Sequence, residues 1–231
     1  MRRSALLLAL GALAACAHRS HSVPAPSGTP GRPKHIVALG DSLAFGTGAS
    51  SPERGFIFRA YLRVRVQNPG SRLDDFAIPG STARDVLRLQ VPRLAHDVAD
   101  AVVICVGGND VVRRVETFAF AAAYARIVAR VRALQPRAAI VCCGVPDVGQ
   151  SPLFTGVDQA EVAALSRAGN AAVRAIAARA GATFVDVYAA SGRASRDINH
   201  FLSDDRFHPG DSGYAELATV LAPALLRVLQ R

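Results

Sequence analysis

The stretch that most constrains the fold is His35–Gly48, which reads HIVALGDSLAFGTG. Its first half is a short apolar run with β-branched residues that ends at Gly40. A run of this kind, without alternating polar residues, is typical of a strand in a parallel sheet that is buried on both faces. Directly after it comes Ser42, at the edge of the sheet where open α/β folds bind their ligands. The stretch predicts an α/β fold and makes Ser42 the candidate nucleophile.

Further strand-like runs alternate with helical patterns along the rest of the chain. We expect strands at 72–78, 102–106, 138–143 and 183–187, and helices at 56–66, from 81 onward, and at 116–134, 159–180 and 212–229. Strands that alternate with helices form a parallel sheet with right-handed crossovers and helices on both faces. We therefore expect a three-layer α/β/α fold around five parallel strands. The segment 145–158 is expected to be a long loop, and long loops in compact domains often carry function.

Four short blocks of sequence share one order and spread with a known family. They read G-D-S-L from Gly40, I-P-G ending at Gly80, G-G-N-D from Gly107, and D-R-F-H-P from Asp205. In this pattern the chain resembles the SGNH hydrolases, also called GDSL esterases and lipases, from Ile36 to about Leu226. The resemblance implies a flavodoxin-like three-layer fold and a serine esterase that needs no metal and no cofactor.

The resemblance also implies a Ser-His-Asp triad. Serine is a poor nucleophile until a base removes its proton, and a third group must hold that base in the correct tautomer. By resemblance, His208 is the base for Ser42, and Asp205 accepts the Nδ1 proton of His208. Asp204 is the competitor for the last role and ranks below Asp205, because the family pattern D-x-x-H fixes the spacing.

Ester hydrolysis also needs donors aimed at the oxyanion of the tetrahedral intermediate. The resemblance implies three: the backbone N–H of Ser42, the backbone N–H of Gly80, and the side-chain amide of Asn109. Two positions depart from the family pattern. Asp75 stands where asparagine is frequent, and Arg206 stands where a small residue is common. Leu153 and Phe154, in the long loop, are candidates to line an acyl site or to cover the core.

The first 34 residues are expected to lie outside the folded domain. Residues 1–15 combine a basic start with an apolar run that is too short to cross a bilayer, as in a secretory signal peptide. The sequence L-A-A-C ending at Cys16 looks like a bacterial lipobox, which implies cleavage before Cys16 and lipidation of its thiol. Residues 16–34 are rich in proline and read as a tether, and residues 35–231 as the hydrolase domain. We expect a lipid-anchored, extracytoplasmic protein, in the outer membrane if the source is a diderm.

Charge and cysteine content exclude other classes of protein. The net charge of the 231 residues is +9, but residues 35–231 hold 22 basic against 18 acidic residues, a net charge of +4. So small a surplus, without a basic run, gives little support for nucleic-acid binding. Cys105, Cys142 and Cys143 lie in apolar runs and are expected to be buried free thiols. Whether Cys105 pairs with Cys142 or Cys143 is left open, since spacing cannot establish geometry.

Several alternatives stay open or fit less well. Short acyl esters, acetylated glycans, lysophospholipids and thioesters all suit the same machinery. The α/β-hydrolase fold asks for G-x-S-x-G well inside the chain, whereas G-D-S-L-A from Gly40 lacks the second glycine. A metallophosphoesterase needs several converging histidines and carboxylates, and only His208 has a credible place. A non-catalytic binding lipoprotein is the last alternative; it would have no need of Ser42, Asn109, Asp205 and His208 together.

Overall fold

The computed structural model describes residues 31–194 and 197–230. The signal segment, Cys16 and most of the tether therefore lie outside the described residues. Five parallel strands form one sheet in the order β2-β1-β3-β4-β5. They are β1 His35–Gly40, β2 Arg72–Asp75, β3 Ala101–Cys105, β4 Ala139–Cys143 and β5 Thr183–Val185. This is the doubly wound order of flavodoxin-like folds, whose ligands bind where the order reverses, beside β1 and β3.

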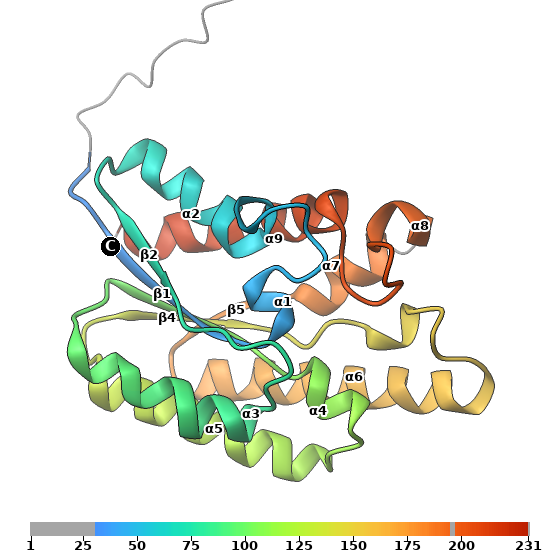
Figure 1. The fold of residues 1–231 in the computed structure, drawn as a ribbon. Helices are drawn as coiled ribbons and strands as arrows, with labels where there is room; N and C mark the ends of the chain where they lie inside the picture. The colour runs from blue at the N-terminus through green and yellow to red at the C-terminus, as the bar shows by residue number, and fades with distance from the viewer. Residues whose placement is uncertain (1–30, 195–196, 231) are drawn as a thin grey trace, which may run out of the picture.

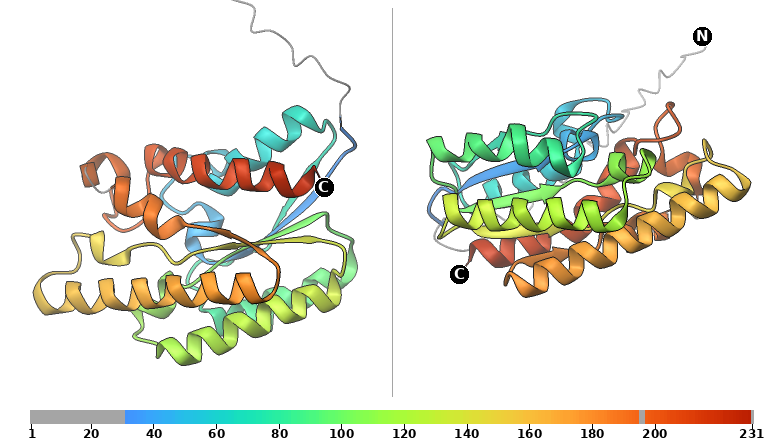
Figure 2. Two further views of the ribbon diagram at one scale, coloured as in Figure 1. Left: turned by 180° about the vertical axis from the view of Figure 1, so that it is seen from behind. Right: turned by 90° about the horizontal axis from the view of Figure 1, so that it is seen from below.

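Helices cover both faces of the sheet, as Figure 1 shows. One face carries α2 Phe56–Gln67, α7 Val187–Ala194 and α9 Asp211–Leu229. The other face carries one helical segment made of α3 Ala83–Asp85, η2 Val86–Gln90 and η3 Val91–His96. It also carries the long helices α5 Thr117–Leu134 and α6 Gly156–Arg179. These two helices lie side by side, as Figure 2 shows. Short elements complete the carboxyl edge: α1 Ser42–Phe45, η1 Pro52–Arg54, α4 Gly108–Val112, η4 Val148–Gln150 and α8 Ile198–Phe201. The expected three-layer fold is confirmed.

The position of β1 inside the sheet explains why its sequence does not alternate between apolar and polar residues. Ile36 and Ala38 pack into the cluster beneath α2 and α9, whereas Val37 and Leu39 pack into the cluster beneath α5 and α6. All four side chains are buried because both faces of the sheet are covered. The apolar run therefore marks a strand at the centre of the molecule.

Several predicted boundaries were wrong by a few residues. β2 ends at Asp75 rather than 78, since the chain beyond it gives β1 only isolated hydrogen bonds, from Phe76 and Ile78. β5 ends at Val185 rather than 187, because the Asp186 carboxylate accepts the backbone N–H of Ala189 and starts α7. Helix α6 begins three residues before the predicted 159, and the loop ahead of it contains η4.

The helix expected from residue 81 onward begins with a capping box. The Thr82 side chain accepts the backbone N–H of Asp85, and the Asp85 carboxylate accepts the backbone N–H of Thr82. These two bonds satisfy donors that would otherwise be unpaired at a helix start. Of the two capping residues considered, Ser81 and Thr82, the structure uses Thr82.

Helix α9 is, among the described residues, the one helix long and apolar enough to span a membrane. Its apolar character has a local explanation, because Leu217, Leu221 and Leu225 are fully buried in the core between α9 and the sheet. We therefore assign α9 to the core of the domain.

The described cysteines are buried free thiols, as expected. Cys105 and Cys143 belong to the core on the α9 side, whereas Cys142 faces the α5 side. Burial raises the pKa of Cys142 to about 12. Cys142 therefore behaves as a small apolar side chain.

Candidate active site

The turn after β1 presents Ser42 at the carboxyl edge of the sheet. Asp41 caps α1: its carboxylate accepts the backbone N–H of Leu43 at 3.0 Å and that of Gly107 at 3.2 Å. Gly40 must be a glycine, because a Cβ there would lie 2.0 Å from the carbonyl oxygen of Cys105. Strand β1, the glycine at position 40 and the cap formed by Asp41 together fix the backbone that carries Ser42.

Ser42, His208 and Asp205 form one hydrogen-bonded chain. The Ser42 Oγ lies 2.9 Å from His208 Nε2, and His208 Nδ1 lies 2.6 Å from Asp205 Oδ2. The second carboxylate oxygen of Asp205 accepts the backbone N–H groups of Phe207 and His208, each at 2.8 Å. Because the carboxylate is held from two sides, it orients the imidazole toward Ser42. The hydrogen-bond partner of His208 is Asp205, not the neighbouring Asp204.

Electrostatics keep Asp205 ionised. Burial raises its pKa, but the hydrogen bonds from His208, Phe207 and Ser203 outweigh that effect and lower the pKa to about 2. An ionised carboxylate at Nδ1 favours the tautomer that leaves Nε2 free to accept a proton. The arrangement suits a histidine acting as a general base toward Ser42.

The three donors expected for the oxyanion hole are two backbone N–H groups and one side-chain amide, and of their residues Ser42 and Asn109 line one cavity. In the part of the chain that the structure describes, the backbone N–H groups of Ser42 and Gly80 have no hydrogen-bond acceptor. Asn109 donates one amide hydrogen to the carbonyl of Ser81 at 3.1 Å, which leaves its second amide hydrogen available. Gly80 has a left-handed φ of 83°, and nothing lies within 4 Å of a Cβ built there. The glycine is needed for its backbone angle rather than for close packing.

Two buried carboxylates beside the site were not predicted from the sequence. Burial raises the pKa of Asp41 and the pKa of Asp110 to about 6 each. Asp110 accepts the backbone N–H of Ala83 at 2.9 Å and so ties α4 to α3. The only sequence signal for either residue is its place in the G-D-S-L and G-N-D blocks.

Gln90 is a third residue that the sequence did not point to. Its side chain is fully buried behind the turn, and its carboxamide bonds both backbone groups of Gly40. A single glutamine in a helical segment carries no recognisable pattern, so only the structure reveals it.

A small cavity opens beside Ser42 and His208. Its volume is about 60 Å³. Its apolar wall comes from the loop after β4, from α8, from the segment between α8 and α9, and from α9, and includes Val148, Ile198, Phe201, Leu202, Phe207 and Leu217. Leu153 and Phe154 do not line it: Leu153 is 56% exposed, and Phe154 packs against Phe207 with ring centroids 6.5 Å apart. Of the two roles considered for these residues, Phe154 has the second, because it packs against the core cluster beneath α5 and α6.

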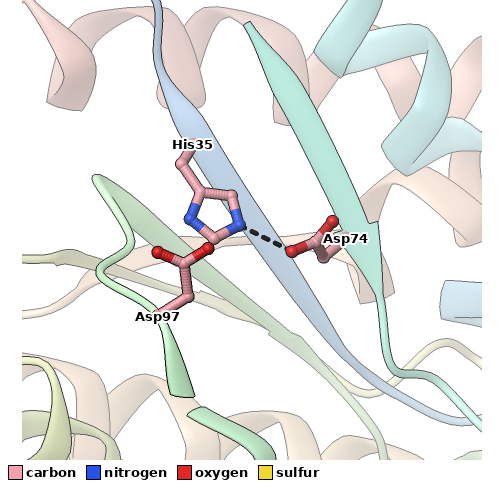
Figure 3. Close-up of side chains that lie close together, drawn as sticks. All are labelled: His35, Asp74 and Asp97. Carbon is pink, nitrogen blue, oxygen red and sulfur yellow. Dashed lines mark hydrogen bonds and ion pairs between the residues drawn. The ribbon is translucent and has the colours of Figure 1, made fainter. Parts of the chain in front are cut away.

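Among the described residues, one cluster has the composition of a metal site. His35, Asp74 and Asp97 lie together at the amino-terminal edge of the sheet (Figure 3). The guanidinium of Arg72 donates to Asp97 and contacts His35 Nδ1 at 3.1 Å, so this cluster already holds a cation. The cluster lies at the opposite end of β1 from Ser42 and has no part in the candidate site.

Comparison with known proteins places the fold. TesA covers 84% of this chain and 99% of its own, with 20% identity and a TM-score of 0.69. The psychrotrophic esterase EstA from Pseudoalteromonas sp. covers 86% of this chain and 100% of its own, with 16% identity and a TM-score of 0.66. The acetylxylan esterase Axe2 from Geobacillus stearothermophilus covers 87% of this chain and 96% of its own, with 22% identity and a TM-score of 0.64. No curated protein sequence matches the chain.

The sequence itself decides the family. The sequence profile of the GDSL-like lipase/acylhydrolase family matches residues 38–216. This span contains all four blocks that carry the resemblance to SGNH hydrolases, and it covers most of the chain. The protein therefore belongs to the GDSL-like lipase/acylhydrolase family and is a carboxylic ester hydrolase.

Proposed function

We propose that the protein is a serine esterase that hydrolyses short acyl esters through Ser42, His208 and Asp205. The observation that carries this proposal is the 2.9 Å contact between Ser42 Oγ and His208 Nε2, with Asp205 holding the other ring nitrogen. Nucleophile, base and orienting carboxylate are then in place before substrate binds.

In the proposed reaction, Ser42 Oγ attacks the acyl carbonyl while its proton passes to His208 Nε2. The oxyanion forms toward the backbone N–H groups of Ser42 and Gly80 and the free amide hydrogen of Asn109. When the intermediate collapses, His208 gives the proton to the leaving alcohol, and an ester of Ser42 remains. Water then repeats the sequence with His208 as base, which releases the carboxylic acid and restores Ser42. Asp205 stays ionised throughout and stabilises the imidazolium.

The cavity supports a short acyl group. The cavity of about 60 Å³ is well below the roughly 300–1,000 Å³ of pockets that hold drug-sized ligands. A mostly apolar cavity suits the acyl group, because that group stays on Ser42 while the alcohol must leave and water must reach His208. Acetyl and similar short esters, including acetylated glycans, fit better than the long chains of lysophospholipids or fatty acyl thioesters.

We also propose that Cys16 is lipidated and anchors the protein outside the cytoplasm. The described chain enters the domain at His35, the start of β1, whereas Ser42 follows the end of the same strand (Figure 1). An anchor at Cys16 would therefore join the domain at the edge opposite the active site. Cys16→Ser should move the full chain from the membrane to the soluble fraction; equal membrane retention would contradict the anchor.

The experiment that tests the proposed reaction is hydrolysis of p-nitrophenyl esters from acetate to palmitate by the full chain, with and without a chelator. We expect the highest kcat/KM on acetate to butyrate, no effect of the chelator, and loss of activity in Ser42→Ala by about 10⁶ in kcat. A long-chain optimum would overturn the short-acyl assignment, and an active Ser42→Ala would overturn the nucleophile. A folded wild type without activity on any ester, acetylated xylan included, would favour the binding lipoprotein.

A further inference from the structure

Gln90, whose side chain is fully buried, is the last residue of a π-helical turn. Residues Val86–Gln90 form a π-helix between α3 and the 3₁₀-helical segment η3. Such wide turns are rare, occur mostly as single turns, and are frequent at functional sites. Burying a carboxamide is costly unless its polar atoms are all bonded. The partners of Gln90 therefore show what the turn achieves.

The first partner is the backbone of Gly40. The N–H of Gly40 donates to Gln90 Oε1 at 2.8 Å, and Gln90 Nε2 donates to the carbonyl of Gly40 at 2.7 Å. Strand β2 ends at Asp75, and beyond it the backbone N–H of Ile78 also donates to the carbonyl of Gly40, at 3.1 Å. The carboxamide adds to this single backbone bond and holds both backbone groups of Gly40, two residues before Ser42.

The second partner joins the other side of the site. Gln90 Nε2 also donates to the Ser81 hydroxyl at 3.3 Å. Ser81 follows Gly80 directly, and its carbonyl accepts the amide of Asn109 at 3.1 Å. One buried carboxamide thus connects the segments that carry all three proposed oxyanion donors, on Ser42, Gly80 and Asn109.

We propose that Gln90 is a positioning residue for the oxyanion hole. It touches no reacting atom; it fixes the distance between the turn after β1 and the turn at Gly80–Ser81. Donors to an oxyanion are effective only when they are held in place before the charge develops. The inference rests on the proposed serine esterase reaction and adds to it the residue that aligns its donors.

The chain offers a matched control at the opposite edge of the sheet. Gln135 is also buried, and its Oε1 accepts the backbone N–H of Ala99 at 3.0 Å. Its Nε2 donates to the carbonyls of Leu94 and Asp97 at 2.6 and 2.7 Å. Both glutamines clamp backbone in the same way, but only Gln90 does so next to the candidate site.

The test compares Gln90→Leu with Gln135→Leu in the full chain, using p-nitrophenyl acetate. Both changes remove a buried carboxamide and should lower the thermal unfolding midpoint. For Gln90→Leu we expect kcat to fall roughly 10- to 100-fold with KM within about threefold, because misplaced donors act on the transition state rather than on substrate binding. For Gln135→Leu we expect kcat within about twofold of wild type, since no catalytic group is near.

Equal kcat values for wild type and folded Gln90→Leu would overturn the proposal, as would equal losses in the two variants. If Gln90→Leu does not fold, Ser81→Ala decides, because it removes only the hydroxyl that Gln90 contacts. There we expect kcat to fall roughly 2- to 10-fold, the effect of one weak hydrogen bond, and an unchanged kcat would overturn the link to Gly80. A wild type that is inactive on every ester would instead contradict the proposed function, and with it the proposed role of Gln90.

Discussion

The two edges of the sheet each hold a histidine bonded to an aspartate. At the carboxyl edge, His208 Nδ1 lies 2.6 Å from Asp205; at the amino edge, His35 Nε2 lies 2.8 Å from Asp74. The pairs are similar in exposure, with 19% and 43% for His208 and Asp205 and 9% and 37% for His35 and Asp74. A histidine–aspartate pair is therefore not a catalytic site by itself.

The third partner separates the two pairs. The remaining nitrogen of His208 faces the hydroxyl of Ser42, a group that can lose a proton. The remaining nitrogen of His35 faces the carbonyl of Val98 at 2.8 Å and the guanidinium of Arg72. Neither of these can serve as a nucleophile at neutral pH. At the amino edge, His35 joins β1 to β2 through Asp74, as Figure 3 shows, and to the segment before β3 through the carbonyl of Val98.

Replacing each histidine by alanine should give the largest contrast. His208→Ala removes the proposed base and should lower kcat on p-nitrophenyl acetate by about 10⁶, as loss of the nucleophile does. His35→Ala removes a buried side chain and its hydrogen bonds to Asp74 and the Val98 carbonyl, so it should lower the free energy of unfolding by about 1–3 kcal/mol while kcat changes little. Steady-state kinetics and chemical denaturation measure the two effects, and a His35→Ala enzyme that folds but is inactive would erase the distinction.

The paired aspartates should repeat the contrast at a smaller scale. Asp205→Asn would let His208 hold the wrong tautomer, and we expect kcat to fall by about 10⁴. Asp74→Asn should leave kcat near the wild-type value, because its histidine faces no nucleophile. The measurement is kcat at saturating ester, normalised to folded protein by circular dichroism. An Asp205→Asn variant as active as wild type would show that another group orients His208.

Two asparagines allow the same comparison for the oxyanion hole. Asn109→Ala should lower kcat roughly 10²- to 10³-fold, the usual cost of one oxyanion donor. Asn68 donates its amide to the carbonyl of Arg32 at the amino edge, at 2.9 Å, and Asn68→Ala should leave kcat unchanged. Both are checked with the same ester assay. Full activity in Asn109→Ala would remove that side chain from the oxyanion hole.

The carboxylates of the two edges should respond to pH in opposite directions. Burial raises the pKa of Asp110 to about 6, so Asp110 keeps its proton to a higher pH in the folded state than in the unfolded state. The stability this gives is full below the unfolded pKa of about 3.9 and is lost as pH rises through about 6. At the amino edge burial raises the pKa of Asp100, but Arg32 and the His35 N–H outweigh it and lower the pKa. Its contribution is present above about pH 3.9 and is lost as pH falls.

Asp110→Asn tests this smallest effect. We expect the variant to gain roughly 1–3 kcal/mol over wild type at pH 7, where the wild-type carboxylate must be ionised, and little at pH 4. Unfolding by urea at the two pH values measures the difference. The same gain at both values would mean that ionisation of Asp110 is not its cause.

Local sequence was a good guide wherever the interaction is local. Asp205 and His208 are three residues apart in the D-x-x-H pattern, from which the family resemblance implied their contact, and backbone N–H groups of the same turn also bond the carboxylate. Thr82 and Asp85 form their capping box within one helical turn for the same reason. The left-handed φ of 59° at Arg206 gives a physical reason for the small residue expected there, since such angles favour glycine.

The sequence by itself determined the alternation of buried strands and helices, the family, and the candidate residues in the four blocks. The alternation and each block depend on residues within a few positions of one another, and the family depends on the order of the blocks along the chain. The resemblance implied that His208 serves Ser42, but only the tertiary structure gave the 2.9 Å contact between these side chains, 166 positions apart. Only the structure, too, decided that Gln90 bonds the backbone of Gly40 and that the cavity beside Ser42 is small. Those properties depend on how strands and helices pack across the sheet, and packing between distant segments leaves no periodic mark on the chain.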